Sequence, residues 1–149
     1  MFIGADWQFN ITGLYQGPWG INLGANFYGR QGYPMPYYVR ARTRDVTNDR
    51  VNLLIGSVDT VRLENVYNLD LRLEKAFKIG PIVANLAAEL FNVANANTVL
   101  QRYARAGNWD VRDYDPDDPT AAFEQDDNFN TIQETLSPRI VRLGIRVSF

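Results

Sequence analysis

The C-terminal stretch, residues 137–149, constrains the fold of this chain more than any other segment. Its apolar positions are Val141, Leu143, Ile145, Val147 and Phe149, and they alternate with Arg142, Gly144, Arg146 and Ser148. Successive side chains of a β-strand point to opposite faces, so this pattern predicts a strand with one apolar and one positively charged face. Such an apolar face meets either a second sheet in a soluble sandwich or lipid in a membrane barrel.

The end of this stretch has a form of its own, because the alternation continues to the last residue without a polar tail. The pattern resembles the C-terminal signal that the barrel-assembly machinery of Gram-negative outer membranes recognises. The positions that carry this predicted assembly signal are Arg142, Gly144, Val147 and Phe149. The alternative is an ordinary amphipathic strand that ends the chain.

Four more segments alternate in the same way, so we expect five long strands. They cover residues 3–15, 19–30, 61–78, 82–93 and 138–149. The fourth also allows a helix, because Ile82, Leu86 and Leu90 recur at helical spacing. The Gly80-Pro81 turn before it and the alternating strand before that turn favour a strand.

The first two strands are expected to form a hairpin about Gly17, where Gln16-Gly17-Pro18 reads as a tight turn. This turn places Tyr15 opposite Trp19 and Ile11 opposite Leu23. The apolar faces of the two strands then coincide, as the register of a hairpin requires.

Short and long connections follow one another along the chain. The short ones are 16–18 and 79–81, and the long ones are 31–60 and 94–136. The first long connection contains a candidate hairpin of Val39–Val46 with Val51–Ile55, whereas the second is polar and irregular. Membrane barrels have short periplasmic turns and long extracellular loops. We therefore expect an all-β fold, an antiparallel up-and-down transmembrane β-barrel segment, with Phe149 on the periplasmic side.

Composition excludes several functions. The sequence contains neither cysteine nor histidine, which removes disulfides, thiolate metal sites and the commonest general base. A formal net charge of −2 gives no basic excess for nucleic acid. Aromatic residues make up 13%, as in proteins with interfacial aromatic belts. We expect a protein that is not an enzyme and uses no cofactor.

Five strands do not close a membrane barrel, which needs at least eight, and open sheet edges are not viable in lipid. The N-terminal residues also lack the features of a signal peptide. We therefore expect the chain to be the C-terminal segment of a longer protein whose N-terminal remainder supplies the other strands.

The order of several phrases resembles the late barrel strands of TonB-dependent receptors, and most closely the Oar-like group with a carboxypeptidase-regulatory-like domain. These phrases are Gly13–Leu23, Gly29–Pro34, Asn68–Lys75, Glu89–Asn95 and Ser137–Gly144. The resemblance implies a large outer-membrane barrel with a plugged lumen and energised uptake of a bulky nutrient. In that family the plug and the TonB-contacting box lie N-terminal to the segment seen here.

Three sets of residues are candidates for a site. Six charged residues are expected to face the lumen, as a hydrated wall, a substrate path or a plug contact: Asp70, Arg72, Glu74, Glu89, Arg142 and Arg146. A weak calcium-loop spacing joins Asp113, Asp115, Asp117 and Glu124, but its sixth position is Asp118 where glycine is needed. Loop aromatics that either stack on a ligand or pack the loops are Tyr33, Tyr37, Tyr38, Tyr103, Trp109 and Tyr114.

The predicted function is that of the C-terminal barrel portion of an outer-membrane receptor and transporter. Its expected partners are the lipid of the outer membrane, the barrel-assembly machinery and the plug and strands of the same receptor. Two alternatives remain open. One is a structural or scaffolding outer-membrane barrel without transport, and the other is a soluble all-β binding module.

Overall fold

A computed structural model describes residues 4–42, 50–118 and 120–149 of the chain. The chain is all-β, with 60% of its residues in strands. No helix within these ranges is long and apolar enough to cross a membrane. The chain divides into two compact units, each described separately below. Unit 1 comprises Gly32–Glu64, Val99–Thr135 and the N-terminal residues, and unit 2 comprises Asp6–Gln31, Asn65–Thr98 and Leu136–Phe149.

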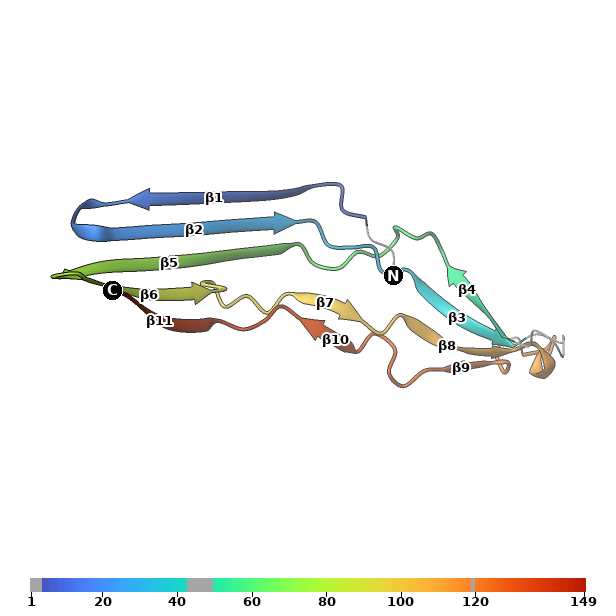
Figure 1. The fold of residues 1–149 in the computed structure, drawn as a ribbon. Coiled ribbons are helices and arrows are strands. Elements are labelled where there is room, and N and C mark those ends of the chain that lie inside the picture. Colours follow the sequence, from blue (N-terminus) through green and yellow to red (C-terminus); the bar gives the residue numbers. More distant parts are fainter. Residues whose placement is uncertain (1–3, 43–49, 119) are drawn as a thin grey trace. The chain divides into compact units, whose positions relative to one another are not determined.

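Unit 2 is a single antiparallel sheet of five strands in the order β1-β2-β5-β6-β11 (Figure 1). The strands are β1 (Gln8–Gln16), β2 (Ile21–Arg30), β5 (Val66–Ile79), β6 (Ile82–Phe91) and β11 (Ile140–Ser148). They lie within or close to the five segments expected from the alternation, although Ile3 falls outside the described residues. Among those residues β1 and β11 each pair with one neighbour only, so the sheet is open.

The register keeps the alternation in phase across all five strands. Leu73, for example, lies opposite Leu23 of β2 on one side and opposite Ala88 of β6 on the other. Ala88 in turn lies opposite Leu143 of β11. Because opposed residues share a face, the apolar positions of every strand lie on the same side of the sheet.

The predicted register of the first hairpin is wrong by four positions. Tyr15 lies opposite Leu23, and Ile11 lies opposite Phe27. The reason is a wider turn: Pro18–Gly20 forms a 3-10 turn in which Trp19 has φ 60° and Gly20 has φ 72°. A shift by an even number preserves parity, so the apolar faces still coincide.

The turn also changes the place of Trp19, which belongs to no strand and has 82% of its surface exposed. The segment 82–93, for which a helix was the alternative, forms strand β6. The strand expected from position 61 begins only at Val66, because residues 61–63 instead make backbone hydrogen bonds with Tyr33 and Met35 in unit 1.

Unit 1 corrects the prediction of an irregular second connection. Its strands are β3 (Tyr37–Arg42), β4 (Arg50–Ile55), β7 (Val99–Arg102), β8 (Arg105–Asp110), β9 (Phe123–Gln125) and β10 (Ile132–Thr135). They form a four-stranded sheet, β4-β3-β8-β9, and a pair, β10-β7. The expected hairpin appears as β3 with β4, although its Val46 lies outside the described residues.

One strand pair departs from the antiparallel prediction, because β3 and β8 run parallel. The polar segment that contains β7 to β10 shows weak alternation, since these strands are only three to six residues long. Short strands of this kind pair through their backbones, and backbone pairing leaves little trace in the side-chain pattern.

Burial is slight in the described part of the chain. The apolar residues that are buried are Met35, Ala41, Val66, Val99, Ala106 and Ala122, and none of the described side chains is less than 2% exposed. The described structure therefore holds no large hydrophobic core beneath the five-stranded sheet. This arrangement is unusual for a water-soluble domain, in which the apolar face of a sheet packs against another layer.

Candidate functional site

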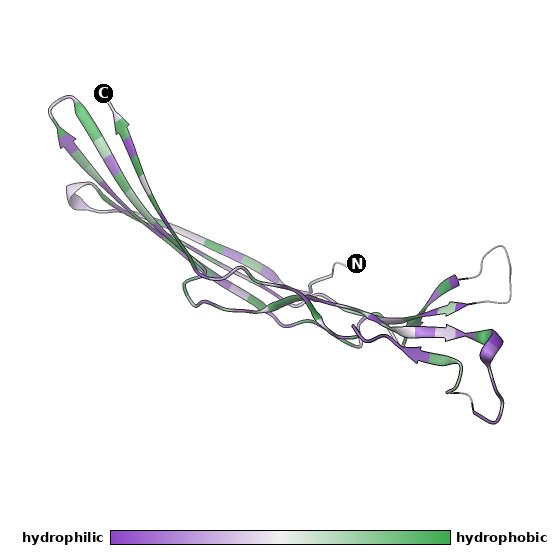
Figure 2. Cartoon of the chain, turned by 90° about the horizontal axis from the view of Figure 1, so that it is seen from below, coloured by the Kyte–Doolittle hydropathy of each residue, from purple (hydrophilic) through white to green (hydrophobic). Residues whose placement is uncertain are grey.

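One side of the sheet of unit 2 is apolar and is here called the apolar face. Hydrophobic and hydrophilic positions alternate along its strands in Figure 2. Large members of this face with more than a third of their surface exposed are Ile11, Tyr15, Leu23, Phe27, Tyr67, Leu71, Leu73, Phe77, Ile79, Ile82, Leu86, Val141, Leu143, Ile145 and Val147. A continuous exposed apolar area of this kind marks a surface that meets lipid or another protein.

One cation, Lys75, interrupts the apolar face and was not singled out by the sequence pattern. It lies opposite Ile21 and Leu86, close to the end of the sheet that holds the short turns. Its ammonium donates to the carbonyl oxygen of Trp19 in the turn and lies 5.6 Å from the ring centroid of Phe77. The charge is thus carried towards the sheet end while the aliphatic part of the side chain stays on the apolar face.

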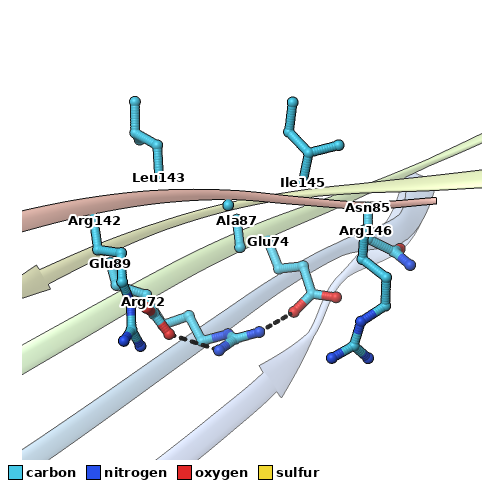
Figure 3. A pocket seen from close by; sticks show the side chains of 10 residues that line it. Arg72, Glu74, Asn85, Ala87, Glu89, Arg142, Leu143, Ile145 and Arg146 are labelled. Atoms are coloured by element: carbon cyan, nitrogen blue, oxygen red, sulfur yellow. Dashed lines mark hydrogen bonds and ion pairs between the residues drawn. The ribbon is translucent and has the colours of Figure 1, made fainter.

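The opposite side of the sheet, here called the polar face, carries all six residues expected to face a lumen. They come from β5, β6 and β11 and are Asp70, Arg72, Glu74, Glu89, Arg142 and Arg146. Figure 3 shows Arg72, Glu74, Glu89, Arg142 and Arg146 on the side opposite to Leu143 and Ile145.

Four of the six form an ion-pair network. Arg72 donates through Nη1 to Oε1 of Glu89 at 2.6 Å and through Nη2 to Oε2 of Glu74 at 2.8 Å. Arg142 donates through Nε to Oε2 of Glu89 and lies 5.2 Å from the ring centroid of Phe91. Both arginines are about half exposed or more, so each pair is worth little individually.

The network lines a shallow cavity of about 280 Å³ together with Asn85, Ala87 and Arg146. Glu89 of β6 pairs with Arg72 of β5 on one side and with Arg142 of β11 on the other, and its side chain is only 12% exposed. The arrangement makes a charged wall.

A second polar feature, at the end of β6, was missed by sequence reasoning. Asn92, which follows β6, is 4% exposed and has a left-handed backbone with φ 48°. Its side chain bonds both the N–H (3.0 Å) and the carbonyl oxygen (2.9 Å) of Ala96 and donates to the carbonyl oxygen of Ser137 at 2.7 Å. Its own N–H donates to Asp70 at 3.0 Å. Asn92 therefore links β5, the end of β6 and the segment that precedes β11. The local signal in the sequence was the spaced asparagines Asn92, Asn95 and Asn97.

The predicted assembly-signal residues are divided between the two faces of β11. Arg142 and Gly144 lie on the polar face and Val147 on the apolar face, while Phe149 follows the strand and is fully exposed. A side chain at Gly144 would meet no atom within 4 Å, so packing within the described structure does not require glycine there.

The predicted calcium residues do not form a site in unit 1. Asp113 ends a 3-10 turn, Val111–Asp113, and Glu124 lies in β9 opposite Asn108. Asp115 accepts a hydrogen bond from the N–H of Asp117 at 2.9 Å. Across the described ranges no three acidic side chains are close enough to hold a metal ion. The strand β9 separates the last position of the loop from the others.

Asp126 is the anchor of the loop that joins β9 to β10. Oδ2 of Asp126 accepts from Nε of Arg105 at 2.8 Å, and Oδ1 accepts from the N–H of Asn128 at 3.0 Å. The Asn128 N–H and the Arg105 guanidinium hold the pKa of Asp126 below its ordinary value of 3.8. In the same way Arg112 and Arg42 lower the pKa of Asp110.

A carboxyl group whose pKa is lower in the folded protein stabilises the folded state at pH values above its ordinary pKa. This stabilisation is lost as the pH falls through the lowered pKa. We expect the loop around Asp126 to open when the pH falls below about 4 and the carboxylate takes up a proton. The amide protection factors of Asn128 and Tyr103 at pH 6 and pH 3 measure this opening. Asp126→Asn should show the low-pH behaviour at both values, and unchanged protection at pH 3 in the unaltered protein would contradict the prediction.

The loop aromatics take different roles. Tyr37 packs edge-to-face on Phe129, with ring centroids 4.9 Å apart. Trp109 lines a cavity with several arginines, and Tyr114 is 48% exposed. The three others, Tyr33, Tyr38 and Tyr103, line one cavity of unit 1. The structure thus brings half of this set together and separates the rest.

Comparison with known proteins found no matching family model, no matching curated protein and no matching solved structure.

Proposed function

We propose that the five-stranded sheet is part of the wall of an outer-membrane β-barrel of the TonB-dependent receptor type. In this proposal the apolar face meets lipid and the polar face meets the lumen. Further strands, supplied by more polypeptide of the same receptor, pair with β1 and β11. The two long connections then belong to the outer surface and the short turns to the periplasmic side.

The observation that carries the proposal is the exposed apolar face. Leu143 and Ile145 are 78% and 74% exposed, and Leu71 and Leu86 are 40% and 41% exposed. Each fully buried side chain of this size stabilises a folded protein by roughly 1.5–3 kcal/mol, so a soluble protein would cover such a face. In a bilayer the same face would contact lipid hydrocarbon and would need no covering protein layer.

The connections support the same reading. The turns Gly17–Gly20 and Gly80–Pro81 join β1 to β2 and β5 to β6 at one end of the sheet, and Ser148 lies opposite Val83 at that end. The connections from β2 to β5 and from β6 to β11 leave from the opposite end. This segregation is typical of an up-and-down membrane barrel.

Orientation is tested with single cysteines, since the sequence contains no native cysteine. In whole cells, Asp115→Cys in a long connection should react with a membrane-impermeant thiol reagent. Pro81→Cys in a short turn should react only after the outer membrane is broken. Equal labelling of both variants in intact cells would contradict the orientation, and labelling of both only in the cytosolic fraction would contradict the membrane location.

The assembly-signal hypothesis predicts a specific defect at the C-terminus. Phe149→Ser should reduce the amount of folded, heat-modifiable protein in the outer membrane several-fold, because the terminal aromatic is part of the predicted recognition pattern. Phe149→Tyr, which keeps an aromatic ring, is the matched control. Unchanged folded protein in the Phe149→Ser variant would refute the signal.

A further inference from the structure

A cavity of about 490 Å³ lies in unit 1, outside the sheet discussed above. Its wall combines three aromatic side chains, Tyr33, Tyr38 and Tyr103, with the planar amides of Gln101 and Gln133. The three tyrosines are half-buried, while the two glutamines are exposed at the rim. The volume lies in the range of small-molecule sites, which join apolar and aromatic walls with a few polar groups.

Backbone hydrogen bonds hold the aromatic wall in place. The carbonyl oxygen of Tyr33 accepts from the N–H of Leu63 at 3.0 Å, and the N–H of Tyr38 donates to Ala104 at 3.2 Å. Tyr103 donates its N–H to Thr131 at 2.9 Å and accepts from the N–H of Asn130 at 3.0 Å. The backbone of each of the three tyrosines is therefore hydrogen-bonded to another segment of unit 1.

The segment between Tyr33 and Tyr38 is also stiff. Pro34 and Pro36 fix two backbone angles, and Met35 is 7% exposed and donates its N–H to Val61 at 2.8 Å. A preorganised wall loses little conformational entropy when a ligand binds.

Charge distinguishes this cavity from its neighbour. Arg102 is the single charged residue among those described as lining it, and its Nη1 already donates to the carbonyl oxygen of Asn130 at 3.0 Å. The neighbouring cavity is lined instead by four arginines, Arg40, Arg42, Arg50 and Arg105, with three acidic residues. The tyrosine-lined cavity is therefore suited to an uncharged ligand, which does not require a counter-ion.

We propose that the cavity bounded by Tyr33, Tyr38 and Tyr103 binds a neutral saccharide. A sugar ring presents an apolar C–H face, which an aromatic side chain covers, and hydroxyl groups around its edge. The amides of Gln101 and Gln133 each offer donors and an acceptor that pair with such hydroxyls. The tyrosines add apolar rings, and the hydroxyl of Tyr103 already donates to Oδ2 of Asp126 at 3.4 Å. The proposal deepens the surface role proposed above by naming a ligand class, and it depends on unit 1 alone.

The test is a titration of the full-length protein with neutral oligosaccharides built from glucose, mannose, galactose or N-acetylglucosamine, followed by calorimetry. At least one should bind. Tyr103→Ala should weaken binding about tenfold, whereas Tyr103→Phe, which keeps the ring, should bind within about threefold of the original protein. Gln133→Ala changes an exposed residue and should weaken binding at least threefold.

Tyr114→Ala is the control outside the cavity and should bind normally. The proposal is overturned if no neutral oligosaccharide binds, if Tyr103→Ala and Gln133→Ala both bind normally, or if Tyr114→Ala is equally impaired. Outer-membrane assembly of the same variants is measured in parallel. Normal assembly without saccharide binding refutes this inference alone, and saccharide binding without membrane assembly refutes the proposed barrel alone.

Discussion

Ala88→Arg is expected to remove most of the folded protein from the outer membrane. Ala88 lies on the apolar face at the centre of the sheet, opposite Leu73 and Leu143. If that face meets lipid, an arginine near the bilayer midplane costs about 2–4 kcal/mol, which is a large fraction of the roughly 5–15 kcal/mol by which a folded state is typically stable. The measurement is the fraction of heat-modifiable protein in isolated outer membranes.

Ala87→Arg provides a closely matched control, since the adjacent residue lies on the polar face opposite Glu74 and Gly144. The new guanidinium would face water and a nearby carboxylate, so assembly should remain near normal. The pair shares the starting residue, the strand and the introduced charge, and differs only in the face. Equal assembly of both variants would contradict a lipid-facing role, and improved solubility of Ala88→Arg in detergent-free buffer would favour a soluble module.

Asn92→Ala is expected to lower the free energy of unfolding by about 4 kcal/mol. The change removes three side-chain hydrogen bonds, to the N–H and carbonyl oxygen of Ala96 and to the carbonyl oxygen of Ser137, from a residue that is 4% exposed. Each such bond contributes roughly 1 kcal/mol. It also places alanine in the left-handed region, which costs about 1 kcal/mol more than it costs asparagine or glycine.

Urea unfolding in phospholipid vesicles measures this effect, and Asn92→Gly separates its two causes. Glycine loses the same hydrogen bonds but adopts the left-handed backbone freely, so it should recover roughly 1 kcal/mol of the loss. Asn95→Ala is a milder comparison, because exposed Asn95 accepts only one backbone hydrogen bond through its side chain, from Arg139 at 3.0 Å. A loss of under 1 kcal/mol for Asn92→Ala would show that this tie is dispensable.

Much of the five-stranded sheet was predictable, because each of its strands alternates strictly between polar and apolar side chains. Parity alone places Arg72, Glu89 and Arg142 on one face, and the structure joins them into a network through Glu89. Parity could not show which of these charges touch, since that depends on the register between strands that are not adjacent in sequence. Arg142 and Glu89 are opposite each other only because β11 pairs with β6.

The errors have local physical causes. The register of the first hairpin differs from the predicted register by four positions. The cause is a wider turn in which Trp19 and Gly20 adopt positive φ, and a Gly-Pro pair does not specify such a turn. The prediction of an irregular segment at 94–136 is wrong, because this polar segment contains short strands held by backbone hydrogen bonds. The weak calcium spacing is a different case, because it was only a candidate, and in the structure β9 places Glu124 opposite Asn108.

Strand alternation and turn residues were enough to predict an all-β chain whose five-stranded sheet has one apolar and one polar face. These properties are local, because they depend on a period of two along the backbone. Pairing partners, the Asn92 tie, the parallel β3/β8 pair and the tyrosine-lined cavity depend on contacts between residues far apart in the chain. Such contacts are chosen by packing and backbone pairing in three dimensions, so the folded structure alone reveals them.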